Sequence, residues 1–194
     1  MTHVAEIIEA STAEFTAECY QLHHPPPLGS LVKTSDGAVE IYGVVASAAT
    51  ESIEPGRRPI ARGQGAATEE DIYRQNPQLA KLLRTWFRAL VVGHGEGESL
   101  CHYLPPHPAR VHSFVALCTS EEVARFTQSL DFLSLLAAAG VPGTADEVIA
   151  ACLRCAGHAH PDRERFLVGA GKELTLLLGG ELARLNAILR RIRP

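Results

Sequence analysis

The sequence predicts an α+β protein: a small closed β-barrel with an inserted helix, followed by an all-helical C-terminal domain. Two observations predict this architecture. Up to residue 117 the chain is rich in glycine, proline and short apolar runs, which is typical of strands and turns. Beyond it, apolar residues recur at steps of three and four, as in amphipathic helices. We therefore divide the chain into a barrel domain at residues 1–117 and a helical domain at residues 118–194.

Alternating apolar residues predict the first strands of the barrel. The runs at 4–8 and 15–22 read as strands, and the prolines at 25–27 place a loop after the second. Asp36-Gly37 predicts a tight hairpin turn between strands at 31–34 and 38–48. Gly43 predicts a bulge or bend in the second of these strands. We expect Leu31, Val39, Ile41 and Val45 to lie in or next to one barrel core.

Helix-start signals interrupt the strands in the middle of the barrel domain. Thr68 precedes three acidic residues, and Asn76-Pro77 repeats the signal. The apolar spacing from Leu79 to Trp86 predicts that the second helix continues to Trp86 and lies against the barrel. We expect strands at 88–92 and 111–117, joined by a long surface loop over 93–108.

The second half of the chain predicts helices separated by glycine-rich breaks. One helix begins at Thr119 or Ser120 and continues to Gly140, and the next begins at Thr144. A final helical region carries a heptad-like apolar seam, for which two roles remain open: it joins two copies of the chain as a homodimer, or it is buried between the barrel and the helix at 121–138 of the same chain. The seam consists of Leu178, Leu182, Leu185, Leu189 and Ile192.

Composition and charge argue against several classes of protein. Eighteen basic residues against 22 acidic ones give a net charge of −4, so nucleic acid is an unlikely partner. The longest apolar runs, such as 135–139, are too short to insert in a membrane. The N-terminal residues do not have the pattern of a secretory signal. Five scattered cysteines predict reduced thiols and a cytoplasmic location.

The motifs that common enzyme classes require are missing. No Walker loop occurs, because Gly169-Ala170-Gly171-Lys172 is followed by Glu173 instead of a hydroxyl residue that would bind magnesium. No G-x-S-x-G nucleophile elbow occurs. The adjacent pair Cys101-His102 does not place a base against a thiol. We therefore assign no catalytic residue and no cofactor, and we expect a protein that is not an enzyme.

Two alternatives remain open. The first is a metal or thiol enzyme that uses Cys152, Cys155, His158 and His160, although we expect both cysteines to be buried thiols without metal. The second is an accessory factor in nucleic-acid processing that uses arginine patches, because arginines bind phosphate backbones. These patches consist of Arg57, Arg58 and Arg62, and of Arg184, Arg190, Arg191 and Arg193.

The stretch from Gly29 to Thr50 resembles the HAS-barrel, the small β-barrel at the N-terminus of HerA-type ATPases and of the rotary ATP synthase head subunits. The matching features are Val32-Lys33 in the entering strand, the Asp36-Gly37 turn and the return strand with Tyr42-Gly43-Val44. The resemblance implies a non-catalytic barrel that assembles with, or docks, a partner protein. It implies a HerA-type or related ATPase as that partner, because the ATPase core itself is absent from this chain. We therefore expect an assembly or adaptor protein.

Overall fold

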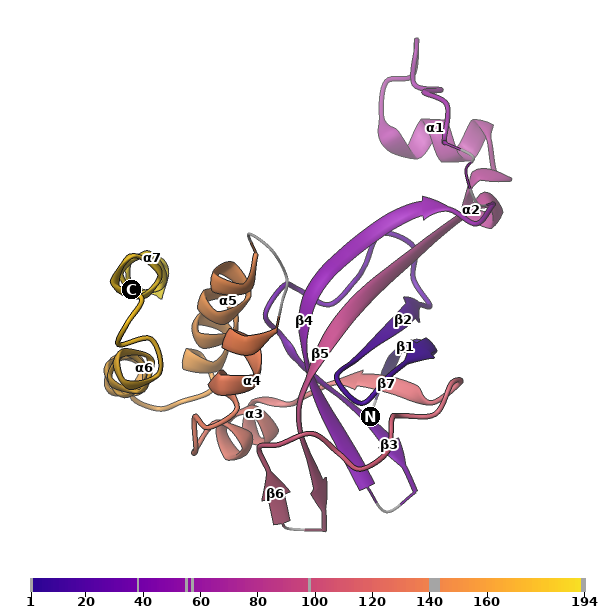
Figure 1. The fold of residues 1–194 in the computed structure, drawn as a ribbon. Coiled ribbons are helices and arrows are strands. Elements are labelled where there is room, and N and C mark those ends of the chain that lie inside the picture. The colour runs from indigo at the N-terminus through magenta and orange to yellow at the C-terminus, as the bar shows by residue number, and fades with distance from the viewer. Residues whose placement is uncertain are drawn as a thin grey trace.

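The computed structural model describes residues 2–37, 39–54, 56, 58–97, 99–139 and 144–192. It shows an α+β protein with a closed β-barrel of six antiparallel strands, one extra strand, and helices gathered mostly in the C-terminal part (Figure 1). The strands are β1 (His3–Ala10), β2 (Glu14–Cys19), β3 (Leu31–Asp36), β4 (Val39–Ser52), β5 (Leu83–Glu96), β6 (Ser99–Cys101) and β7 (Phe114–Leu117). The helices are α1 (Glu69–Gln75), α2 (Leu79–Leu82), α3 (Ser120–Phe126), α4 (Leu133–Ala138), α5 (Ala145–Gly157), α6 (Arg163–Leu177) and α7 (Leu182–Ile192).

The strands follow the order β2-β1-β7-β3-β4-β5-β6, and pairing of β2 with β5 closes the barrel. The predicted hairpin is confirmed: Asp36 pairs with Val39, and Gly37 has a φ of +66°. The predicted irregularity at Gly43 is also confirmed, because the β4–β5 register shifts between Tyr42 and Gly43. Closure leaves most strands paired on both sides, which removes open sheet edges.

The barrel interior is a small apolar core. Ile7, Phe15 and Phe87 are its large, fully buried members, and Ile41 and Val45 lie with them. Val39 packs at the margin of this core. The expectation for Leu31 was wrong, because its side chain lies on the opposite face of β3 and joins the second core.

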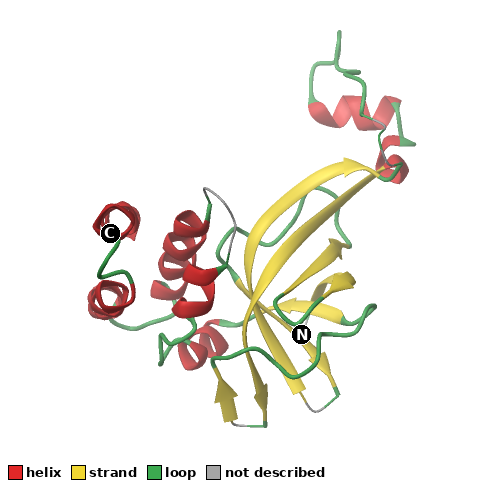
Figure 2. Cartoon of the chain, in the orientation of Figure 1, coloured by secondary structure: helices red, strands yellow, loops and turns green. Residues whose placement is uncertain are grey.

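The second core lies between the outer face of the barrel and the helices. From the barrel it takes Leu31, Tyr42 and Val44, and from the helices it takes residues such as Phe132 and Ile149. α5 is the central helix of this layer and contacts α4, α6, α7 and β4. The strand-rich and helix-rich parts of the chain therefore share this second core. Figure 2 shows the C-terminal helices gathered on one side of the strands.

Three of the expected element boundaries were wrong in the barrel. The helix expected to reach Trp86 ends at Leu82, because β5 begins at Leu83 and continues to Glu96. The pattern from Leu79 to Trp86 spans a short helix and the start of a strand. The expected loop over 93–108 contains the end of β5 and all of β6. The expected strand at 111–117 is limited to β7.

In the helical part, the single helix expected after Thr119 is two helices, α3 and α4. Thr119 is the predicted N-cap of α3 and forms a capping box with Glu122. A turn at Ser129, whose hydroxyl bonds Asp131, separates the two helices. The expected break at 140–143 lies outside the described residues. No described helix is long and apolar enough to cross a bilayer.

Candidate docking surface

β4 and β5 continue beyond the barrel as a two-stranded arm. The last pair between β2 and β5 is Glu18 with Trp86, whereas β4 and β5 remain paired as far as Ser52 and Leu83. At the base of the arm, the guanidinium of Arg84 lies 2.8 Å from the carboxylate of Glu51. The segment between Ser52 and Leu83, which we call the arm tip (residues 53–82), stands away from the barrel (Figure 1).

Hydrogen bonds hold the base of the arm in place. The hydroxyls of Thr50 and Thr85 lie 2.7 Å apart across the ladder. Thr85 is almost completely buried and also accepts a bond of 2.8 Å from the backbone N–H of His23. Further out, the ring of His23 lies 2.6 Å from the hydroxyl of Tyr73 in α1. The loop after β2 therefore supports the arm from one side.

The arm tip has no core of its own. None of its described residues is buried, and α1 and α2 contain no buried side chain. The predicted N-cap of α1 is confirmed, because Thr68 and Asp71 form a capping box. The expectation that this helical region lies against the barrel was wrong (Figure 1). Local caps and turns hold the tip in shape while its apolar side chains face solvent.

The arm tip carries the first predicted arginine patch. Arg58 and Arg62 are exposed, and Arg57 lies outside the described residues. Ile60 stands midway between Arg58 and Arg62 with 76% of its surface exposed. Among the described residues, no acidic side chain forms an ion pair with either arginine. The tip therefore offers an apolar side chain flanked by two cations.

The predicted leucine seam does not lie on one helix. Leu178 closes α6, and α7 begins at Leu182 after the Gly179-Gly180 turn. Leu178, Leu185 and Ile192 are buried in the second core, and Leu189 packs at the margin of that core. In this conformation these four side chains hold the chain's own helices together. Leu182, by contrast, is 65% exposed.

A cavity of about 490 Å³ lies beside the base of the arm. Arg84, Trp86 and Arg88 are alternate residues of β5, so they share the outer face of that strand. The indole N–H of Trp86 and the Nε–H of Arg88 are buried without a hydrogen-bond partner. Three carboxylates line the same cavity, so its charge does not select an anion; these are Glu9, Glu14 and Glu51.

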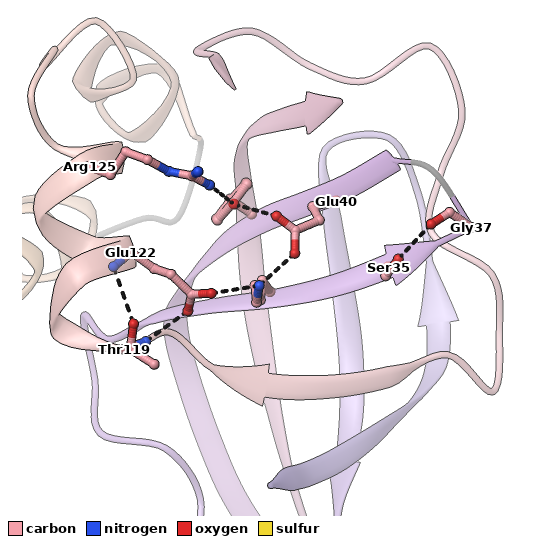
Figure 3. Close-up of polar contacts among 8 residues, drawn as sticks. Ser35, Gly37, Glu40, Thr119, Glu122 and Arg125 are labelled. Carbon is pink, nitrogen blue, oxygen red and sulfur yellow. Dashed lines mark hydrogen bonds and ion pairs between the residues drawn. The ribbon is translucent and has the colours of Figure 1, made fainter. Parts of the chain in front are cut away.

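A buried ionic network connects the barrel to α3 (Figure 3). The ammonium of Lys33, 7% exposed, lies 2.5 Å from a carboxylate oxygen of Glu40 and 2.7 Å from one of Glu122. The hydroxyl of Tyr42 donates to Glu40 at 2.7 Å and accepts from Arg125 at 3.3 Å. Strand β3, strand β4 and helix α3 each contribute to this network, so it ties the barrel to the helical layer.

The same contacts shift the proton affinities of the network. Burial alone would lower the pKa of Lys33, but its hydrogen bonds to Glu122 and Glu40 raise the pKa overall. Burial alone would raise the pKa values of Glu40 and Glu122, yet their hydrogen bonds to Lys33 keep both below the usual value. Burial and the carboxylate of Glu40 raise the pKa of Tyr42 to about 12. All members therefore keep their ordinary charges at neutral pH.

The four cysteine and histidine residues that the sequence suggested as metal ligands lie in different environments. Cys152 is buried in the helical core, where burial raises its pKa to about 12. Cys155 is partly buried, and its thiol lies 3.8 Å from the carbonyl oxygen of Leu28. His158 is exposed, whereas His160 stacks on Phe166 and lies 2.8 Å from the Thr127 hydroxyl. Within the described ranges, no three His, Cys, Asp or Glu side chains are placed to share a metal ion.

The glycine-rich segments lie within regular secondary structure. Gly93 and Gly95 belong to β5 near its hairpin with β6, and Gly169 and Gly171 lie inside α6.

The arginines of the second patch do not form one free surface: Arg184 pairs with Asp146 at 2.8 Å, and Arg191 pairs with Glu147 at 2.7 Å. Arg190 is exposed on α7, and Arg193 lies outside the described residues.

Sequence reasoning missed the arm and the ionic network. A signal for the arm was present in the sequence. Arg84, Trp86 and Arg88 alternate with Thr85, Phe87 and Ala89, and this period of two extends the strand back toward Leu83. No local pattern indicated that Glu122 would meet Lys33, because the two are far apart in the chain. Neither a protein-family model nor a curated protein matches this chain.

Proposed function

We propose that this chain is a non-catalytic assembly or adaptor protein that docks a partner protein through its arm. One observation carries the proposal: the arm tip projects from the barrel, and no described residue in it is buried (Figure 1). Ordering such a segment costs conformational entropy that its own contacts do little to offset. Burial of its exposed apolar side chains in a partner would supply the missing stabilisation. These side chains are Ile53, Ile60 and Leu82.

The form of the rest of the molecule supports this proposal. A closed barrel offers few free strand edges, so docking by addition of a strand is disfavoured there. The second core and the Lys33 network hold the helices against the barrel, and the arm extends from this packed part of the molecule. The resemblance of residues 29–50 to the HAS-barrel favours a HerA-type or related ATPase as the partner. Five free cysteines favour a cytoplasmic setting.

Nucleic-acid binding is the second candidate, and the exposed pair Arg58 and Arg62 is the observation that favours it. The same tip carries Glu69 and Glu70 in the first turn of α1, which oppose the approach of a phosphate backbone. We therefore prefer a protein partner. Salt-sensitive binding of a DNA or RNA duplex, lost in Arg58→Ala/Arg62→Ala, would reverse this preference.

The test replaces residues 53–82 with Asn-Gly, a dipeptide that closes a two-residue hairpin between the paired residues Ser52 and Leu83. Tagged full-length protein and this arm-replaced variant are used for affinity capture from the source organism, followed by quantitative mass spectrometry. Tyr103→Ala, a change at a 61% exposed residue outside the arm, is the matched control.

We expect a defined partner, with a HerA-type ATPase as the first candidate, to be enriched by the full-length protein and by Tyr103→Ala. The arm-replaced variant should lose that partner. Equal enrichment by all three proteins would show that the arm is not the docking element and would contradict the proposal.

A further inference from the structure

A shallow apolar groove of about 340 Å³ lies between the start of α4 and the end of α6. Its apolar wall includes Leu130 and Leu133 on one side and Leu176 and Leu177 on the other. Leu176 is 78% exposed and Leu177 is 40% exposed, so this wall is open to solvent. Exposed leucines that gather beside a groove are typical of a protein-binding site.

The rim of the groove is acidic. Asp131 and Glu173 both line it. Asp131 accepts a hydrogen bond of 2.8 Å from the hydroxyl of Ser129, which leaves its charge uncompensated. Among the described residues, neither carboxylate has a cationic partner. The groove therefore suits an apolar side chain that is flanked by positive charges.

The arm tip presents that chemistry. Ile60 is the most exposed large apolar residue of the tip, and Arg58 and Arg62 stand two positions before and after it. In an extended segment, residues two apart project to the same side. Ile60 and both guanidiniums would then face one surface together.

We propose that the groove between α4 and α6 binds the arm tip of a second copy of this chain. Ile60 lies against Leu176 and Leu177, and Arg58 and Arg62 lie beside the acidic rim. The contact is between chains, because the arm tip and α6 lie at opposite ends of the molecule (Figure 1). This inference rests on the proposed function because it takes the arm as the docking element; it names a second copy of this chain, in place of an ATPase, as the occupant of the arm.

Such a contact is heterologous: one surface of each copy meets a different surface of the next. Head-to-tail contacts of this kind form rings if the rotation closes and open filaments if it does not. The contact therefore differs from the two-fold homodimer that the leucine seam suggested. Most of that seam is buried within the chain, so it is not available for such a dimer.

The test is sedimentation velocity on the purified full-length protein over a wide concentration series. The wild type should form species larger than one chain, and added salt should weaken them because the rim contacts are ionic. Ile60→Asp removes the arm contact, and Leu176→Asp removes the groove contact. Both residues are exposed, so neither change disturbs the core. Val168→Asp, on the same helix α6 but outside the groove, is the matched control.

We expect Ile60→Asp and Leu176→Asp to be single chains when each is alone, and Val168→Asp to behave as the wild type. A mixture of Ile60→Asp with Leu176→Asp should form a one-to-one dimer and nothing larger. The first variant retains an intact groove and the second an intact arm, so only one contact can form.

Single chains of the wild type at every concentration would overturn the inference. So would assembly that survives in Ile60→Asp, since the contact would then lie elsewhere. If the wild type stays a single chain while arm replacement still abolishes partner capture, this inference fails and the proposed function stands.

Discussion

Ser52 lies opposite Leu83 at the last pair of the β4–β5 ladder, so the whole arm tip is attached through two residues that already face each other. Replacing residues 53–82 with Asn-Gly should therefore leave the barrel intact. Because no described residue of the tip is buried, we expect a change in unfolding free energy within about 1 kcal/mol. Urea denaturation measures it, and a loss of several kcal/mol would show that the tip supports the core.

Gly29 places the loop after β2 directly against α5. It has a φ of +80°, and a Cβ atom there would lie 2.4 Å from backbone atoms of Ala151 and Cys152. Gly29→Ala should push the barrel and the helical layer apart. Gly37→Ala is the matched control, because Gly37 also has a positive φ but has nothing within 4 Å of the added Cβ.

Both glycine variants carry the conformational cost of a positive φ, and only Gly29→Ala adds a clash. We expect Gly29→Ala to lose about 1–3 kcal/mol more stability than Gly37→Ala. Chemical denaturation of both variants decides this. Equal losses of stability in the two variants would mean that the loop and α5 can accommodate the added Cβ atom without destabilising the protein.

The Lys33 network should make stability depend on pH at the acidic end. Glu40 and Glu122 have pKa values below the usual 4.5 in the folded chain, despite their burial, because they bond Lys33. Their contribution to stability is therefore complete above 4.5 and is lost as the pH falls through the lower folded values. We expect the unfolding free energy to fall as the pH decreases below the usual carboxyl value of 4.5.

Two variants test this assignment. Lys33→Met leaves two carboxylates without their cation and should cost about 3–5 kcal/mol at neutral pH. The triple variant Lys33→Met/Glu40→Gln/Glu122→Gln should lose much of the acid sensitivity. Breaking the more exposed pair with Arg84→Met is the control and should cost about 1 kcal/mol or less. An unchanged pH profile in the triple variant would assign the acid sensitivity to other carboxyls.

The thiol of Cys152 should be inert in the folded protein. Burial raises its pKa to about 12, so very little thiolate is present near neutral pH, and the side chain is only 3% exposed. A short pulse of iodoacetamide followed by mass spectrometry should label Cys101, which is partly exposed, well before Cys152. Labelling in denaturant should reach all five cysteines. Fast labelling of folded Cys152, or one bound zinc per chain, would contradict this assignment.

The sequence was most informative where local chemistry decides the structure. Asp36-Gly37, Thr68 and Thr119 act through turns and caps, which depend on only a few neighbouring residues. The break between α3 and α4 was missed, because the apolar spacing from Phe126 to Leu133 fits a continuous helix, whereas a turn at Ser129 separates the two helices.

The candidate docking surface could be predicted only in part. Arg58 and Arg62 were identified from composition, and the structure places them on the arm tip. The sequence left open whether the leucine seam contacts a second chain or the chain's own helices, because a heptad pattern does not distinguish a partner chain from a neighbouring helix of the same chain. After the Gly179-Gly180 turn the chain forms the separate helix α7, which packs against α5 and buries Leu185 in the second core.

Hydrogen exchange of the arm tip, measured on the free chain and on the complex captured with it, tests the central claim most directly. Most amides of residues 53–82 should exchange quickly in the free chain, because the segment is exposed, and should become protected in the complex. The barrel amides should change little. Protection that appears on the barrel or the helices while the arm tip continues to exchange quickly would contradict docking through the arm.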